Sequence, residues 1–594
     1  MLGCLMVCSN RRNIAGFAGR ARWMVALGSV AVAATSSFAE VQPPNAGMLL
    51  QSVPVTKHQE SQLDLIEQKL QGIKAMTDVE GLKLEVKSIR ISGLTVISPD
   101  ELQPAVSKFI GPDKNFQDLL DAAGAIRREL AQRGYFLADA IIPQQKIENG
   151  IVEIFVIEGR LGKVRVEYDD NVMINHTLIN EYVSELETGS VITARAVERA
   201  LFLISDLRGI HARSVFEPGE KVGTADLVIK VSQAKSFDGN VDFDMNGSEY
   251  TGYLRGGGGV DGNNLLGQGD LLSVRSSKSL DTGGMGYMRT SYLTPFGPWG
   301  SKIGASYSVL HYRLGTVYFD PAKASGKAAV SSIVGVHPFI RSRNVNFMVM
   351  YQFDDRRLHD IQETPGLLTD KALRVNSVIL SGDLRDPLFG GGINVGNLAF
   401  TSGRVNFFNA GARAIDSDPS AGRHTQGDYS KANLTYSRLQ QLTKTTGIYV
   451  SFSEQWASKN LDMSEKFSLG GPNAVRAYPQ GEASGDEGYV GAIEMRYGVS
   501  KTNWIMNNWM TDWMQGSMAF TAFYDYGRSR LNKIPNVYDV ANVANISGVG
   551  AGLNWEDPNN WTMRTTAAWR LNQKPQSETI DRKPRVYFQL SKYF

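Results

Sequence analysis

Few residues in this chain have the types and spacing that enzyme or metal chemistry requires. The seven histidines are scattered, without an HExxH motif or the spacing of a zinc ligand set. Both cysteines, Cys4 and Cys8, lie near the N-terminus, so we expect no disulfide, thiolate metal site or cysteine nucleophile in the rest of the chain. The run "RGGGG" (255–259) has no following Gly-Lys-Ser/Thr and is interpreted as a flexible strand or bulge. We therefore expect no catalytic residue, no metal ion and no cofactor.

One arginine stands out by its setting. Arg476 lies in "NAVRAYPQGEASGDEG" (473–488), a glycine-rich stretch in which it is set between Val475 and the aromatic Tyr478. A guanidinium can bind a carboxylate through two parallel hydrogen bonds, a directional contact that lysine copies poorly. The alternative is an ordinary solvated loop arginine. The elements around it decide between the two.

The N-terminus carries the features of an export signal (residues 1–39). A basic stretch, Arg11 to Arg22, precedes the apolar run "WMVALGSVAVAA" (23–34), which is too short to span a bilayer as a helix. Small residues then predict cleavage after Ala39, and an uncleaved membrane anchor is the alternative. Loss of the signal's four arginines moves the formal net charge from +2 to −2. A near-neutral chain has no basic footprint for nucleic acid.

A linker and an internal repeat follow. Residues 40–84 are expected to form a linker with an amphipathic helix, because four apolar residues fall on one helical face, namely Leu63, Ile66, Leu70 and Ile73. Residues 85–159 and 160–234 then repeat with a constant offset of 75 residues, which relates Arg90 to Arg165, Gly134 to Gly209 and Ile151 to Asp226.

Each repeat is predicted to fold as strand, helix, helix, strand and strand, a small α+β domain. The inward face of the longer helix is predicted to comprise Leu119, Ala123, Ile126 and Leu130 in the first repeat, and Ala196, Ala200, Leu203 and Leu207 in the second. The exposed strand edges of such a domain suit the binding of extended peptides.

Residues 235–594 alternate between apolar and polar positions, the pattern of a membrane β-barrel. In "SMAFTAFYDYG" (517–527), Phe520 and Tyr524 belong to the apolar face, so strict alternation turns Asp525 inward. Sixteen strands would leave about 22 residues for each strand and its connection, which suits membrane strands of roughly 9–11 residues. The last strand, "RVYFQLSKYF", contains Phe588 and ends on Phe594. A soluble all-β domain is the alternative.

Five segments in this order resemble a known family, the TpsB transporters of two-partner secretion (ShlB/FhaC/HecB type). Two resemble its paired POTRA domains, one resembles an early barrel hairpin, "VRAY" falls where the superfamily has Val-Arg-Gly-Phe/Tyr, and "FYDYG" fits its Phe-x-Asp-x-Gly strand motif. These segments are "RGYFLADAIIPQQKIENGIVEIFVIEGRLGKV" (133–164), "SDLRGIHARSVFEPGEKVGTADLVIKV" (205–231), "DGNNLLGQGDLL" (261–272), "VRAY" (475–478) and "FYDYG" (523–527).

The resemblance implies a sixteen-stranded outer-membrane barrel preceded by two periplasmic POTRA domains, in a Gram-negative bacterium. Its function would be the secretion of one large TpsA-type protein, whose N-terminal secretion domain the POTRA domains bind. The membrane lipid and the barrel assembly machinery would be further partners, the latter through Phe588 and Phe594 at the C-terminus. An outer-membrane assembly or insertion factor and a passive solute porin are the alternatives.

The resemblance also implies how the pore is closed. An N-terminal helix would plug the lumen, either at "NAGMLLQSV" (45–53) or in the stripe from Leu63 to Ile73. The loop that carries Val475, Arg476 and Tyr478 would fold back into the barrel and place Arg476 on Asp525, within the strand motif that also contains Phe523 and Gly527. Ala477 replaces the family's usual glycine. If that position has a positive φ, alanine would cost about 1 kcal/mol.

Overall fold

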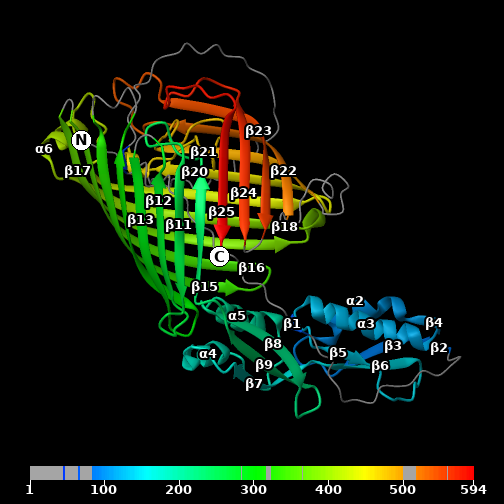
Figure 1. Ribbon diagram of the computed structural model, residues 1–594. Coiled ribbons are helices and arrows are strands. Elements are labelled where there is room, and N and C mark those ends of the chain that lie inside the picture. The colour runs from blue at the N-terminus through cyan, green and yellow to red at the C-terminus, as the bar shows by residue number, and fades with distance from the viewer. Residues whose placement is uncertain are drawn as a thin grey trace, which may run out of the picture. The chain divides into compact units, whose positions relative to one another are not determined.

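The computed structural model describes residues 45–46, 65–66, 83–281, 284–315, 323–363, 366–499, 517–557 and 560–594. The predicted export signal and most of the linker lie outside these residues. The described chain forms two small α+β domains and one large barrel (Figure 1). None of the helices in these ranges is long and apolar enough to cross a lipid bilayer.

The first small domain is built around helix α3. Its N-terminus is closed by a capping box, in which Asn115 and Asp118 exchange side-chain and backbone hydrogen bonds. The predicted inward face is confirmed, because Leu119, Ala123, Ile126 and Leu130 are at most 4% exposed. The elements are β2 (Leu84–Val86), β3 (Ser88–Ser92), α2 (Pro99–Val106), η1 (Ser107–Phe109), β4 (Gly111–Lys114), α3 (Phe116–Gln132), β5 (Asp139–Ile141) and β6 (Ile151–Ile157).

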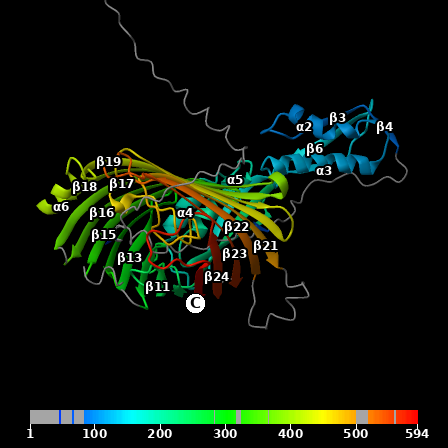
Figure 2. The ribbon, with the colours of Figure 1, turned by 90° about the horizontal axis from the view of Figure 1, so that it is seen from above.

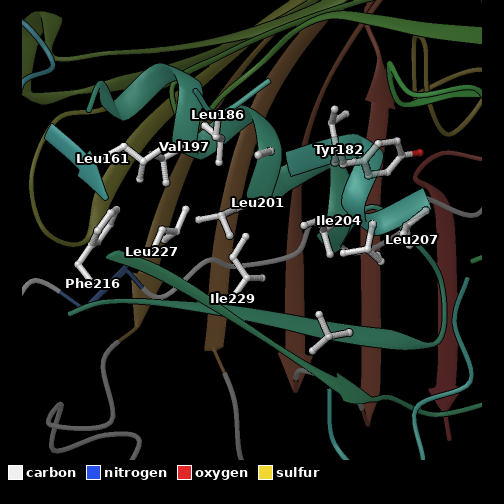
Figure 3. Packing of buried hydrophobic residues seen from close by; sticks show 14 of the residues in the cluster. Leu161, Tyr182, Leu186, Val197, Leu201, Ile204, Leu207, Phe216, Leu227 and Ile229 are labelled. Atoms are coloured by element: carbon white, nitrogen blue, oxygen red, sulfur yellow. The ribbon is translucent and has the colours of Figure 1, made fainter. Parts of the chain in front are cut away.

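The second small domain has the predicted order of strand, helix, helix, strand and strand, and the first domain contains β2, η1 and β4 in addition. One residue of its predicted helix face is wrong: Ala196 is exposed, whereas Val197, Leu201 and Ile204 fill the core (Figure 3). Turning these larger side chains inward buries more apolar surface than the alanine would. The elements are β7 (Arg160–Tyr168), α4 (His176–Val183), α5 (Ala194–Ser205), β8 (Ile210–Pro218) and β9 (Thr224–Gln233).

The linker departs from the predicted helix where it is described. Residues Leu65–Ile66 form a short strand, β1, that pairs in parallel with Ser214 and Val215 of β8. β8 is an edge strand, and its unpaired backbone groups offer hydrogen bonds that compete with helix formation. The helix prediction is therefore wrong at these two residues, and the rest of the stripe lies outside the described residues.

The barrel is a closed sheet of sixteen strands within the described residues, each paired with its neighbours in an antiparallel ladder (Figures 1 and 2). They are β10 (Phe237–Asp244), β11 (Arg255–Asn263), β12 (Leu271–Ser279), β13 (Gly284–Phe296), β14 (Ser301–Arg313), β15 (Ser325–Arg341), β16 (Val345–Gln362), β17 (Leu367–Asp386), β18 (Gly392–Phe407), β19 (Gly427–Gln441), β20 (Thr446–Ala457), β21 (Glu487–Val499), β22 (Ser517–Arg530), β23 (Val543–Asp557), β24 (Trp561–Arg570) and β25 (Arg585–Tyr593). In the part of the barrel that the structure describes, three short helices lie between strands, namely η2 (Leu388–Gly390), α6 (Ala410–Asp416) and η3 (Met463–Glu465).

The predicted alternation on β22 is confirmed. Phe520 and Tyr524 are 49% and 43% exposed on the outer face, while Asp525 is fully buried on the inner face. "RGGGG" lies inside β11 and pairs with both neighbouring strands without a bulge. Alternation therefore fixes which side chains line the lumen.

The second small domain contacts the barrel through ion pairs at the strand ends. Asp206, which follows α5, accepts two hydrogen bonds from Arg341 at the end of β15, at 2.8 and 2.9 Å. The backbone oxygen of Asp206 also accepts a 2.8 Å bond from Lys302 of β14. This end of the barrel is therefore the one that meets the α+β domains.

We predict that Glu158 makes the first small domain sensitive to acid. Burial alone would raise the pKa of Glu158, but hydrogen bonds from Thr95 and Val96 and the nearby Arg160 outweigh it and hold the pKa below its ordinary value. Because the folded-state pKa is depressed, the stabilisation is present above the unfolded-state pKa and is lost as pH falls through the folded-state pKa. Glu158→Gln should lower the free energy of unfolding by about 1–3 kcal/mol at pH 7. The variant should no longer lose this stabilisation as pH falls.

Hydrogen exchange of residues 93–97 between pH 7 and pH 3 measures this effect. The exposed Glu148→Gln is the control, and it should leave both the protection and its pH dependence unchanged. Equal protection in the two variants at pH 7 would contradict the prediction.

Candidate functional site

The segment between β20 and β21, residues 458–486, is folded back into the barrel. We call it the pore loop. Its two legs are joined by an antiparallel bridge, in which Phe467 and Gly485 exchange backbone hydrogen bonds of 2.7 and 2.8 Å. At its tip, Arg476 is 5% exposed and Tyr478 is fully buried. A polar loop reaches such burial here because it packs against the inner faces of β21 to β25.

Arg476 is held by Asp525. Its Nη2 and Nε atoms donate to the two carboxylate oxygens at 2.8 and 3.0 Å, and its backbone N–H donates to Oδ2 at 3.0 Å. The guanidinium also lies 3.3 Å from the ring centroid of Phe523, in a cation–π contact. The two-pronged bond and the flat stacking together require arginine rather than lysine.

A second carboxylate completes the cluster, and the sequence analysis missed it. Glu494 of β21 accepts a 2.5 Å bond from Arg476 and a 2.8 Å bond from Arg496. Glu494 and Asp525 thus face the guanidinium groups of Arg476, which is buried, and of Arg496, whose side chain is 33% exposed. The signal that could have found Glu494 is the alternation of "AIEMRYG", where Ile493 faces outward and its neighbour inward.

The side chains beside Arg476 fix the tip of the loop. Val475 is fully buried and lies over Gly527 of β22, where a Cβ would come within 3.1 Å of the valine. The Tyr478 hydroxyl donates to the backbone oxygen of Gln573 at 2.9 Å, and its own backbone oxygen accepts a 2.8 Å bond from Tyr587 of β25. The tip is thus bonded to β25 and to the connection that precedes it.

Ala477 does not have the positive φ that would have strained it. Its methyl group is 1% exposed and packs directly on Gly548 of β23, where an added Cβ would lie 2.4 Å from it. In this chain, the glycine that permits the close approach of loop and barrel is therefore Gly548 on the barrel wall. Ala483, further along the loop, does have a positive φ of 52°.

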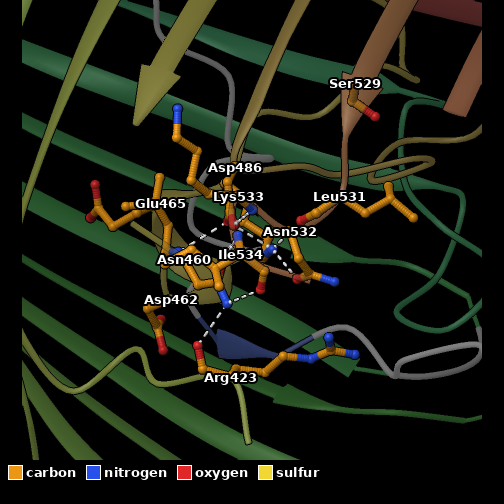
Figure 4. Close-up of polar contacts among 12 residues, drawn as sticks. Arg423, Asn460, Asp462, Glu465, Asp486, Ser529, Leu531, Asn532, Lys533 and Ile534 are labelled. Carbon is orange, nitrogen blue, oxygen red and sulfur yellow. Dashed lines mark hydrogen bonds and ion pairs between the residues drawn. The ribbon is translucent and has the colours of Figure 1, made fainter. Parts of the chain in front are cut away.

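The other half of the loop is bonded to a different part of the wall. We call residues 460–466 the loop root. Lys371 of β17 pairs with Asp462 at 2.6 Å, and Glu465 pairs with Arg356 of β16 at 2.6 Å and with Lys431 of β19 at 2.8 Å. Figure 4 shows the root, where the side-chain amide of Asn460 donates to the backbone oxygen of Ile534 at 2.8 Å and accepts from the Ile534 N–H at 2.7 Å. The loop therefore crosses the lumen from β16–β19 to β21–β25.

The two C-terminal aromatics lie at the closing seam of the barrel. Phe594 exchanges backbone bonds of 3.1 and 3.2 Å with Gly239, and its exposed ring lies over that glycine. Phe588 faces outward, 6.3 Å from the ring of Phe243 on β10. Within the described ranges, no group of histidine, cysteine, aspartate and glutamate could hold a metal ion.

Comparisons with known proteins agree with this architecture. The family model described as "Haemolysin secretion/activation protein ShlB/FhaC/HecB" matches residues 223–555, and the ShlB-type POTRA model matches residues 84–159. The heme/hemopexin transporter protein HuxB of Haemophilus influenzae (strain 86-028NP) is 28% identical over 83% of each chain. The outer membrane transporter CdiB of Dickeya dadantii is 21% identical over 81% of this chain and 82% of its own length.

A solved structure shares the fold. CdiB from Escherichia coli superposes with a TM-score of 0.63 at 20% identity, over 88% of this chain and 93% of its own. At this identity the likeness concerns the fold alone.

We predict that Gly548 and Ala477 are matched in size. Gly548→Ala should push the loop tip away, because overpacking costs about 1–3 kcal/mol, and Ala477→Gly should restore the fit. Trypsin cleavage after Arg476 in the folded protein measures the displacement: about tenfold faster in the single variant and as slow as the parent in the double variant. Gly396→Ala, with nothing within 4 Å of the added Cβ, is the control. Full protection in the Gly548→Ala variant would contradict the prediction.

Proposed function

This chain belongs to the ShlB/FhaC/HecB family of haemolysin secretion/activation proteins, and we propose that it moves one large partner protein through its barrel lumen. Proteins of this family are the outer-membrane β-barrel transporters of two-partner secretion in Gram-negative bacteria. The observation that carries the proposal is the pore loop: a barrel built to pass a polypeptide needs a closure that can move. The loop root and tip are held by side-chain contacts rather than by the barrel's backbone ladder.

We propose that the α+β domains lie in the periplasm and bind the N-terminal secretion domain of the partner. Their sheets end in edge strands, which offer unpaired backbone groups to an extended segment. In the first domain the sheet order is β3-β6-β5, so both β3 and the three-residue β5 are edges. Asp206 and Arg341 then bring the second domain to the barrel entrance, where a bound segment would enter.

The partner would cross unfolded and gain its stability by folding at the cell surface. Folding outside removes the crossing segment from the equilibrium and thereby gives the transport its direction.

The occupied lumen argues against a passive solute porin. In the resting structure, the pore loop spans the lumen between two anchors, and its tip residues are almost completely buried. The match to the secretion family, together with the two tandem α+β domains, favours export of a partner over the insertion of other barrels.

We propose that Arg476 and Asp525 set the position of the loop and thereby competence for transport. Sixteen strands close the barrel through their backbone hydrogen bonds, so the fold does not depend on one ion pair. Breaking a buried pair costs about 3–5 kcal/mol, because Asp525 or Arg476 is then left buried without its partner. That is enough to change the population of the bound loop by several orders of magnitude.

Arg476→Ala and Asp525→Ala should each reduce the amount of partner protein in the culture medium at least about tenfold, while heat-modifiable migration shows a folded barrel. Arg476→Lys should reduce secretion to a similar extent, because lysine cannot form the two-pronged bond. Arg528→Ala, an exposed residue on the same strand as Asp525, is the matched control. Normal secretion by the two alanine variants would refute the proposed role, and loss of the folded barrel would assign the pair to folding instead.

A further inference from the structure

Arg374 of β17 lies toward the end of the barrel that is remote from the α+β domains. Arg341, which binds Asp206 of the second domain, is opposite Asn346 in one ladder, and Asn346 is opposite Asp383 of β17 in the next. The C-terminal part of β17 therefore marks the end that meets the domains, and the strand runs back from Asp383 to Arg374 toward the other end.

The outer face has a clear boundary between apolar and charged positions at this remote end. From Val378 to Leu384, which are 41% and 45% exposed, the outward positions of β17 carry no charge, and the strand advances roughly 20 Å. That is most of the apolar band of about 25 Å with which such barrels face lipid. The next outward positions are Asn376 and then Arg374. Arg374 therefore lies just outside the hydrocarbon region, at the level of the lipid headgroups.

The neighbouring strands carry arginines at the same level. Arg357 of β16 and Arg404 of β18 are in phase with exposed aromatic residues of the apolar band, so they also point outward. The side chains of Arg357, Arg374 and Arg404 are 56%, 68% and 59% exposed. In the ladder, Arg374 lies directly opposite Arg404. Like charges in directly opposite positions repel each other, so an anion between them would be stabilising.

The acids at this level leave an excess of positive charge. Asp355 of β16 is shared, because one of its oxygens lies 3.4 Å from Nε of Arg357 and the other lies 3.5 Å from Nε of Arg374. Arg404 donates to both oxygens of Asp428 on β19, at 2.5 and 2.7 Å. Three guanidinium groups thus face two carboxylates, and both contacts of Asp355 are longer than good charge-assisted hydrogen bonds.

An arginine at the other rim of the same outer face is bonded very differently. Arg438 of β19 donates to Asp386, Asn394 and Gln440 at distances between 2.5 and 3.0 Å. Its donors are thereby occupied within the protein. Arg374, by contrast, has only the 3.5 Å contact with the shared carboxylate among the described residues, so its donors are available to a ligand.

The surroundings orient the cluster without neutralising it. The guanidinium of Arg357 lies 5.5 Å from the ring centroid of Phe408, in a cation–π contact. One row further out, Lys327 of β15 and Asp370 of β17 add one charge of each sign on either side of β16. The local excess of positive charge therefore remains.

We propose that Arg357, Arg374 and Arg404 form a binding site for the phosphate groups of a glycolipid of the outer leaflet, the lipid A part of lipopolysaccharide. Each guanidinium can hold a phosphate through two hydrogen bonds, a geometry that lysine lacks. A phosphate between Arg374 and Arg404 replaces their repulsion with attraction, and the acyl chains of the same molecule lie along the apolar band. The inference uses the orientation proposed above, in which the α+β domains are periplasmic and this end of the barrel meets the outer leaflet.

Native mass spectrometry of the folded, detergent-solubilised protein, titrated with diphosphoryl lipid A, measures this binding. Arg374→Gln and Arg404→Gln should each weaken it about tenfold, because each removes charged hydrogen bonds to phosphate. The matched control is Arg528→Gln, which removes an exposed arginine from the outward face of β22 near the same end. Heat-modifiable migration confirms that each variant is folded. Equal affinities in Arg374→Gln and Arg528→Gln would overturn the site.

Asp355→Asn should have the opposite effect. It frees Arg357 and Arg374 from their shared counterion, so lipid A should bind several-fold more tightly. Residues that served only to stabilise the barrel would not give opposite signs for the arginine and the aspartate variants. Unchanged or weaker binding in Asp355→Asn would contradict the site, because the carboxylate would then not compete with the ligand.

Two further ligands distinguish the glycolipid from other sources of phosphate. Phosphatidylglycerol, with one phosphate, should bind at least about tenfold more weakly than lipid A, and equal affinity would overturn the assignment to lipid A. Inorganic phosphate lacks acyl chains and should not displace lipid A at equal concentration, whereas displacement would overturn the assignment to a lipid. Because these arginines face away from the lumen, loss of lipid binding would leave the transport proposal intact. Failure to export a partner would likewise leave the lipid measurements unchanged.

Discussion

The structure depends on one constraint, the strict alternation of side chains along strands whose backbone groups are all paired in a closed ladder. In a bilayer, no backbone group can be left without a partner, and closure removes the edges at which such groups would be exposed. The barrel therefore gains its stability from the backbone and from its outer apolar face. Its inner face is left available for charges such as Glu494 and Asp525, which would be costly on the outside.

The inner face uses that freedom for clusters in which acidic and basic side chains are paired. Arg476 and Arg496 face Glu494 and Asp525 at the loop tip, and acids of the loop root meet wall cations on the other side of the lumen. A buried pair is weak evidence for stability, because desolvation offsets most of its attraction, but removing one partner is expensive. Such clusters hold a loop in one position without contributing greatly to the folded barrel. That is the property a movable closure requires.

Alternation explains why so much could be predicted from the sequence. The period-2 pattern identified the barrel and the inward direction of Asp525, and a constant offset identified the two repeated domains. The pattern did not reveal the contacts that cross the lumen, because the loop root and Arg356 are brought together only by barrel closure. The error at Ala196 has a related cause. Helical periodicity predicts the core-facing side of a helix only to within about one residue, and packing against the sheet decides which residues are buried.

The linker is a second case in which long-range contacts override the local sequence pattern. Leu65 and Ile66 fit a helical stripe in isolation, yet an unpaired edge on β8 draws them into a strand. Ala46 is drawn to Asp360 across more than 300 residues in the same way, by a partner that the local sequence cannot indicate. Distant partners on β8 and β16, rather than the local sequence, therefore decide the positions of the described residues of this segment.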